Sequence, residues 1–162
     1  MHNDLQLTMK TRIYIDTSIV GGFFDEIFET ETKALFEMVK NNEIIFVVSD
    51  LLQDELEDAP EHVRTLLGNY APECFEVVTS TQEAEDLANQ YIAENVIGQT
   101  SFDDCLHIAI ATINKVDILA SWNFKHIVNI NRIRGYNGVN MKLGYSTLEI
   151  RNPKDLIDHA NI

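Results

Sequence analysis

The chain has 162 residues, 45% of them hydrophobic and 23% charged, which is typical of one soluble globular domain with a sizeable core. It contains no apolar run long enough to cross a membrane, and residues 1–10 lack the apolar core of a signal peptide, so we expect a cytoplasmic protein without membrane contact. The net charge of −14 argues against a polyanionic partner, and two cysteines without metal-ligand spacing argue against zinc and disulfides.

The charge is unevenly distributed along the chain. Residues 1–114 hold 22 acids and 5 Lys or Arg, whereas residues 115–162 hold 4 acids and 7 Lys or Arg. No acid lies between Asp117 and Glu149. The cations of this basic strip are Lys125, Arg132, Arg134 and Lys142. The strip is either a solvated loop or a surface that faces phosphate groups, and charge alone favours the loop.

In chain order, short apolar segments alternate with segments of helical periodicity. Strands are predicted at 12–16, 43–49, 74–80 and 116–121, with a weaker fifth pattern at 145–150. Helices are predicted at 30–43, 49–59, 61–70, 80–98 and from 101 onward. This alternation predicts an α/β fold with a mainly parallel central sheet of four to five strands.

The segments outside these predicted elements define the connections and the extent of the domain. The Gly- and Asn-rich stretch 129–145 is interpreted as an irregular loop or a short helix, and Gly98 as the residue that ends the helix before it. Because repeats and linkers are absent, we expect a single domain at 11–157, preceded by a flexible lead-in at 1–10.

Asp16 ends the first predicted strand, and ligands of parallel sheets bind beyond the carboxyl ends of the strands. A carboxylate at the end of a buried strand is costly unless it is hydrogen-bonded, paired or bound to a metal. A helix N-cap at Asp16, Thr17 or Ser18 is the simpler interpretation. Since two hydroxyl residues are available for capping, we favour a functional role for the carboxylate.

Two further acids lie on helix faces that are otherwise apolar. Glu55 shares its face with Leu51, Leu52 and Leu56, which makes it the inward-facing carboxylate of an acidic helix. Asp104 lies on the apolar face of the helix that is predicted from residue 101 onward. Asp103 lies off that face and suits the first turn, where an acid interacts favourably with the helix dipole. A capping box from Ser101 to Asp104 is the alternative.

The segments RIYIDTSIV, SDLLQDELE, DDCLHIAIAT and ILASWNFKHI together resemble the PIN-domain family, which includes bacterial VapC-type toxins. The resemblance covers essentially residues 11–157 in the family's motif order. It implies a three-layer α/β/α domain that binds Mg²⁺ or Mn²⁺ and cleaves RNA. It also implies an antitoxin partner and self-association as a dimer.

Position by position, Asp16 resembles the family's first acid, Glu55 the second and Asp104 the third. Asn123 stands where many members carry a fourth aspartate, and a neutral amide binds a hard cation less strongly than a carboxylate does. The implied ligands are therefore Asp16 and Asp104, with Glu55 binding directly or through water.

The remaining predicted roles surround these ligands. Thr17 or Ser18 is expected to brace Asp16, with Ser121 in the same supporting group, and Asn123 to contact a metal-bound water or the substrate. The basic residues Lys125, Arg132 and Arg134 are expected to hold flanking RNA phosphates.

Two rival functions stay open. The chain could be a non-catalytic PIN-like module that binds RNA or protein with a degraded metal site, or a different α/β enzyme with an acidic site. A phosphatase with an aspartyl nucleophile requires a second aspartate at the position of Ser18. A receiver domain requires an acid pair ahead of its acceptor aspartate, and the sequence has no such pair. His107 and Trp122 are interpreted as core residues, and Tyr136 as a base-stacking candidate if its loop is exposed.

Overall fold

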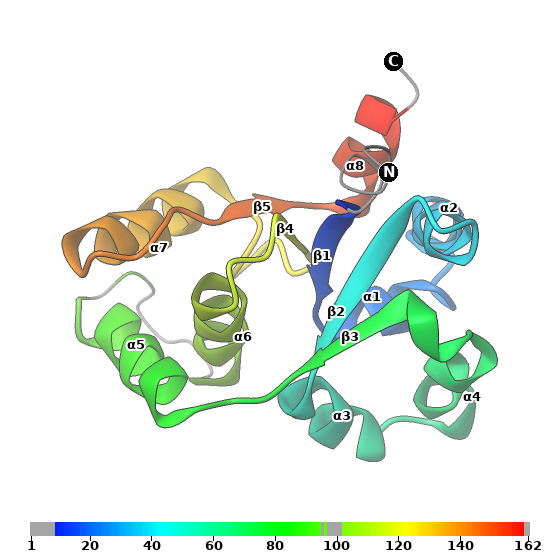
Figure 1. Cartoon of the computed structure of the whole chain (residues 1–162), viewed down its shortest axis with the longest axis horizontal. Coiled ribbons are helices and arrows are strands. Elements are labelled where there is room, and N and C mark those ends of the chain that lie inside the picture. The colour runs from blue at the N-terminus through cyan, green and yellow to red at the C-terminus, as the bar shows by residue number, and fades with distance from the viewer. Residues whose placement is uncertain (1–8, 95, 97–101, 161–162) are drawn as a thin grey trace, which may run out of the picture.

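The computed structural model describes residues 9–94, 96 and 102–160, so the predicted lead-in lies mostly outside the described residues. Its strands are β1 (Thr11–Ile15), β2 (Ile44–Ser49), β3 (Phe75–Val78), β4 (Ile118–Ala120) and β5 (Glu149–Arg151). They form one sheet in the order β3-β2-β1-β4-β5, and every neighbouring pair is parallel (Figure 1). The prediction of a mainly parallel sheet of four to five strands is confirmed.

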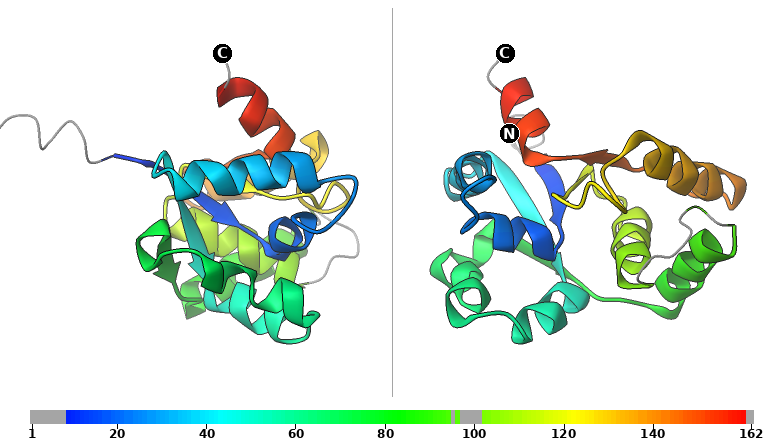
Figure 2. Two further views of the ribbon diagram at one scale, coloured as in Figure 1. Left: turned by 90° about the vertical axis from the view of Figure 1, so that its right-hand side faces the viewer. Right: turned by 180° about the vertical axis from the view of Figure 1, so that it is seen from behind.

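Helices cover both faces of this sheet (Figures 1 and 2). One layer contains α1 (Thr17–Gly22), α2 (Glu29–Lys40), α3 (Asp50–Glu57), α4 (Glu61–Arg64) and α8 (Pro153–Ala160). The other layer contains α5 (Gln82–Ala93), α6 (Phe102–Ile113) and α7 (Ile130–Lys142). The three-layer α/β/α architecture is therefore confirmed.

Alternation along the strands divides the core into two clusters. In β1, Ile13 and Ile15 point into the α1–α2 side, whereas Tyr14 points into the α5–α6 side. Since both faces are covered, the strands carry near-continuous apolar runs, of which β2 is the longest.

Segment 129–145, for which the sequence leaves an irregular loop and a short helix open, mostly forms the 13-residue helix α7. The loop alternative is therefore wrong, and the helix is longer than expected. Asn129 caps the helix by accepting a hydrogen bond from the Arg132 backbone at 2.9 Å. Asn137 bonds both backbone groups of Leu148, beside β5, so tertiary contacts stabilise a Gly- and Asn-rich helix that local propensity disfavours.

Other boundaries shift modestly. The predicted helix at 61–70 divides into α4 and a 3-10 turn, η1 (Leu66–Asn69), and a second 3-10 turn, η2 (Pro72–Cys74), precedes β3. Helix α5 ends at Ala93, and Gly98 lies outside the described residues. The short helix α1 and the helix α8 were not predicted from the sequence.

The order of the strands reverses beside β1. From β1 the chain proceeds to β2 and β3 on one side, and then crosses through α5 and α6 to β4 and β5 on the other. Ligands of parallel sheets bind beyond the carboxyl ends of the strands at such a reversal, which here lies between β1 and β4. None of the helices in the described part of the chain is long and apolar enough to span a membrane.

Candidate active site

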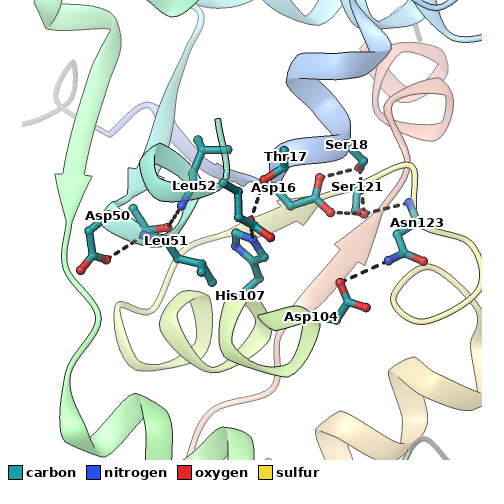
Figure 3. Close-up of polar contacts among 12 residues, drawn as sticks. Asp16, Thr17, Ser18, Asp50, Leu51, Leu52, Asp104, His107, Ser121 and Asn123 are labelled. Carbon is teal, nitrogen blue, oxygen red and sulfur yellow. Dashed lines mark hydrogen bonds and ion pairs between the residues drawn. The ribbon is translucent and has the colours of Figure 1, made fainter. Parts of the chain in front are cut away.

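Asp16 lies at the strand reversal, directly after β1, and only 4% of its surface is exposed. Its Oδ1 accepts hydrogen bonds from the Ser18 hydroxyl at 2.6 Å and from the Ile19 backbone at 3.3 Å, and its Oδ2 accepts one from the Ser121 hydroxyl at 2.5 Å (Figure 3). Asp16 is thus the N-cap of α1, which is one of the three capping alternatives, and the argument that Thr17 and Ser18 leave its carboxylate surplus to capping is wrong. Burial raises the pKa of Asp16 above its ordinary 3.8, and the nearby His107 and the hydroxyl groups offset only part of this effect.

The two serines around Asp16 are held by the backbone after β4. The Ser18 hydroxyl accepts a hydrogen bond from the Trp122 backbone at 2.8 Å, and the Ser121 hydroxyl accepts one from the Asn123 backbone at 2.9 Å. Each hydroxyl hydrogen is therefore directed at the Asp16 carboxylate. The predicted bracing of Asp16 by Ser18 and Ser121 agrees with these contacts.

Asp104 lies in the first turn of α6 and faces the segment that follows β4. Its Oδ1 lies 3.4 Å from Nδ2 of Asn123, a long contact, and its Oδ2 lies 3.0 Å from Nδ1 of His126. Asn123 Oδ1 in turn accepts a hydrogen bond from the His126 backbone at 2.9 Å. Both Asp104 oxygens are thus contacted by one short turn, and Asn123 donates where an aspartate would repel.

Glu55 lies on α3 and is half-buried, with 29% of its side chain exposed. Its Oε1 accepts hydrogen bonds from the Thr17 hydroxyl at 2.7 Å and from Nε2 of His107 at 2.6 Å. Burial alone raises the pKa of Glu55, but the donors His107 and Thr17 outweigh burial and lower it below its ordinary 4.5. The neighbouring acids Asp54, Glu57 and Asp58 are exposed, so the prediction of Glu55 as the inward-facing carboxylate is confirmed.

The predicted acids lie around one end of the sheet but do not form a preassembled cluster. Asp16 connects to Asp104 through Ser121 and Asn123, and it connects to Glu55 through the adjacent Thr17. Among the residues that the structure describes, no three His, Cys, Asp or Glu side chains lie close enough together to hold a metal ion. Each carboxylate is instead stabilised by its own donors, as repulsion between like charges favours.

Sequence reasoning did not find the contacts behind Glu55. His107 is buried, with 2% of its surface exposed, and its Nδ1 lies 2.6 Å from the Tyr14 hydroxyl, which lies 2.8 Å from the Ser49 hydroxyl. The interpretation of His107 as a hydrogen-bonded core residue is confirmed. Its partners are Tyr14 on β1 and Glu55 on α3, and no local pattern marks them.

The basic strip is only partly free to contact a ligand. Lys125 and Arg134 are exposed. Arg132 is half-buried and donates a hydrogen bond to the Val96 carbonyl at 2.6 Å, and Lys142 forms an ion pair with Glu94 at 3.1 Å. Of the three cations assigned to RNA, Arg132 therefore has a structural contact of its own.

The aromatic residues near the site have mainly structural roles. Trp122 is buried, stacks on Phe28 with a ring separation of 4.2 Å, and donates from Nε1 to Thr32 at 2.9 Å, so its interpretation as a packing residue is confirmed. Tyr136 is fully buried within α7, so the proposal that it stacks on bases is wrong. Both cysteines, Cys74 and Cys105, are free and buried.

The fold was compared with solved structures. VapC20 of Mycobacterium tuberculosis, a sarcin-ricin loop cleaving toxin, aligns with a TM-score of 0.56 and 12% identity over 70% of this chain and 91% of that chain. A chain of VapBC2 from Rickettsia felis, bound to a promoter DNA fragment, aligns with a TM-score of 0.56 and 12% identity over 88% and 98% of the two chains. A chain of DNA-bound VapBC from Salmonella typhimurium aligns with a TM-score of 0.52 and 14% identity over 88% and 98%.

The chain has the PIN-domain fold. The sequence matches no family model and no curated protein, so the comparisons with solved structures carry the assignment of the fold. The PIN fold explains why Asp16, Asp104 and Asn123 lie near one another, because their elements converge at the reversal between β1 and β4.

Proposed function

We propose that this chain is a Mg²⁺- or Mn²⁺-dependent endoribonuclease and the toxin of a bacterial toxin–antitoxin pair. The observation that carries the proposal is the environment of Asp16. This carboxylate is 4% exposed at the strand reversal of a PIN fold, and no Lys or Arg among the described residues forms an ion pair with it. A buried negative charge without a cationic partner favours a bound cation.

The residues present fit a hard divalent cation in their chemistry. Asp16, Glu55 and Asp104 offer carboxylate oxygens and Asn123 an amide oxygen, which are the donor types that Mg²⁺ and Mn²⁺ prefer. Asp16 and Asp104 would hold the ion, and Glu55 would bind directly or through water. When bound, the cation would lower the pKa of a water molecule and neutralise charge growing on the phosphate.

The chain's own residues would orient the reaction. Ser18 and Ser121 hold the Asp16 carboxylate by both oxygens, and Thr17 and His107 hold Glu55 by one oxygen. Glu55 would orient the attacking water with its other oxygen. Exposed Lys125 and Arg134 would contact phosphates that flank the cleaved bond.

The toxin role is supported by the proteins that share the fold. One neighbour is described as a sarcin-ricin loop cleaving toxin, and others are chains of VapBC complexes. We propose that an antitoxin binds this chain and covers the same end of the sheet. Expression of the chain alone should then arrest bacterial growth, and co-expression of its antitoxin should restore it.

A nuclease assay on labelled single-stranded RNA tests the enzymatic proposal. We expect cleavage with Mn²⁺ or Mg²⁺ and none with EDTA, and a loss of about a hundredfold or more in Asp16→Asn and Asp104→Asn, the scale set by removal of a group that stabilises the transition state. Asp54→Asn, an exposed acid on α3, is the matched control and should cleave like the wild type. Wild-type rates in both site variants would contradict the assignment.

A non-catalytic PIN-like module is the second candidate. It is favoured by Asn123, which replaces a carboxylate, and by His126, which contacts Asp104. The same assay separates the two, because a binding module would retain RNA without cleaving it at any metal concentration.

A further inference from the structure

Glu55 is held asymmetrically. Its Oε1 accepts two hydrogen bonds, from Thr17 at 2.7 Å and from His107 at 2.6 Å, whereas its Oε2 accepts none from the described residues. The side chain is 29% exposed, so Oε2 is the oxygen available to a ligand. One oxygen is therefore anchored and the other is free, which fixes the direction in which the carboxylate can bind.

The anchor extends through the core of the protein. His107 Nδ1 contacts the Tyr14 hydroxyl at 2.6 Å, Tyr14 contacts the Ser49 hydroxyl at 2.8 Å, and Ser49 accepts the Leu52 backbone N–H at 3.2 Å as the N-cap of α3. Since Glu55 lies on the same helix, the chain of contacts begins and ends on α3. It joins that helix to β1 and α6 at two points.

Every donor in this series of hydrogen bonds from Glu55 to Ser49 can be matched with an acceptor. An ionised Glu55 only accepts, so His107 Nε2 carries a hydrogen and donates it. Ser49 already accepts from Leu52, so its hydroxyl can donate to Tyr14, and Tyr14 can donate to Nδ1 of His107. A single proton on the imidazole then satisfies every group, and this arrangement fixes the tautomer that faces Glu55.

We infer that His107 is a positioning residue of the active site, which, with Tyr14 behind it, fixes Glu55 so that its Oε2 is presented to the divalent cation. The inference rests on the proposed function, whose cation Glu55 would bind. Partners behind a metal-binding carboxylate orient it, and their loss typically weakens metal affinity tenfold to a hundredfold. An apolar residue could fill the same core volume but could not donate to Glu55.

Two substitutions at one position separate positioning from packing. In His107→Gln the side-chain amide replaces Nε2 and can still donate to Glu55, whereas in His107→Asn the amide replaces Nδ1 and Glu55 loses its donor. We expect His107→Asn to raise the Kd for Mn²⁺, measured by calorimetric titration of the full chain, by about tenfold. His107→Gln should stay within about threefold of the wild type.

A double-mutant cycle with Glu55→Gln completes the test. If His107 acts through Glu55, His107→Asn should weaken Mn²⁺ binding no further once Glu55 is replaced, because coupled residues are not additive. Additive losses, or a Kd in His107→Asn equal to that of the wild type, would overturn the inference. Circular dichroism confirms that each variant is folded before the titration.

The titration distinguishes this inference from the proposed function. Mn²⁺ binding that depends on His107, in a protein that cleaves no RNA, would leave the positioning role intact and remove the ribonuclease. RNA cleavage by a protein whose Mn²⁺ affinity does not depend on His107 would support the ribonuclease and overturn the positioning role. A wild-type chain that binds no Mn²⁺ would overturn the positioning role outright.

Discussion

At the scale of single residues, the site combines carboxylates whose environments differ. Asp16 is almost fully buried and burial raises its pKa, whereas Glu55 is half-buried and its donors lower its pKa. Environments that move two carboxyl pKa values apart are typical of functional sites, although ion-pair networks also produce them. The buried charge of Asp16 lowers the stability of the metal-free protein, and a bound cation would restore that stability.

Asp16→Asn should therefore unfold at the same temperature as the metal-free wild type or at a higher one. The amide removes the buried charge, and the Ser18 and Ser121 hydroxyls, 3.3 Å apart, can bond each other when one accepts from the amide. Thermal unfolding in EDTA measures this. Mn²⁺ should raise the melting temperature of the wild type and not that of the variant, since only the wild type retains the ligand.

At the scale of elements, an ion pair joins strands that are not neighbours. Arg12 on β1 forms a bidentate pair with Glu76 on β3, at 2.8 and 2.6 Å, across the intervening β2. The same guanidinium donates to the carbonyls of Asn114 and Lys115 after α6. Arg12 thus holds the amino end of the sheet to the connection that leads into β4.

Glu76→Gln should reduce stability in a pH-dependent way. The hydrogen bond from Arg12 lowers the pKa of Glu76 below its ordinary 4.5, so the stabilisation is present above pH 4.5 and is lost as pH falls through the lower folded pKa. Because Glu76 is 36% exposed, solvent screening limits the difference to about 0.5 kcal/mol. Urea unfolding at pH 7 and pH 3 should show a larger difference at pH 7 than at pH 3.

Two glycines of α7 should respond oppositely to alanine. A Cβ at Gly135 would lie 2.5 Å from Cγ1 of Val96, whereas a Cβ at Gly138 meets nothing within 4 Å. Gly138→Ala should stabilise the protein by about 0.5–1 kcal/mol through helix propensity. Gly135→Ala should destabilise it, because the short, branched Val96 side chain cannot move aside. Urea unfolding of both variants measures this, and equal effects would contradict the close approach of α7 to Val96.

At the scale of the whole molecule, charge is divided between an acidic body and a basic carboxyl-terminal third. The strip between Asp117 and Glu149 includes the turn after β4 and helix α7, so it begins beside Asn123 at the candidate site. Lys125 and Arg134 are exposed there, while Arg132 bonds the chain itself. Local positive charge near the site can thus coexist with a net charge of −14.

Lys125→Ala combined with Arg134→Ala should weaken RNA binding and reduce its dependence on salt. Each lost phosphate contact on a single strand lowers the slope of log affinity against log salt by about 0.7. Fluorescence anisotropy with labelled RNA at several salt concentrations measures the slope. Lys154→Ala, at an exposed position on α8, is the control. An unchanged slope in the double variant would show that the basic strip does not contact RNA phosphates.

Local pattern by itself determined the strands, most helices and the inward faces of Glu55 and Asp104, because periodicity reports which face of an element is buried. It also placed Asp16 at a strand end. Local pattern left α7 undecided between a loop and a short helix, because Asn129, Asn137 and Tyr136 stabilise this helix through contacts with neighbouring segments.

Only the tertiary structure decided how the site is built. It brought Ser121 to Asp16 across 105 positions and His107 to Tyr14 across 93. It also placed the three acids around one end of the sheet, each with its own donors, rather than in a single cluster. Such contacts depend on strand order and on which helix crosses which face, and no segment of the sequence contains that information alone.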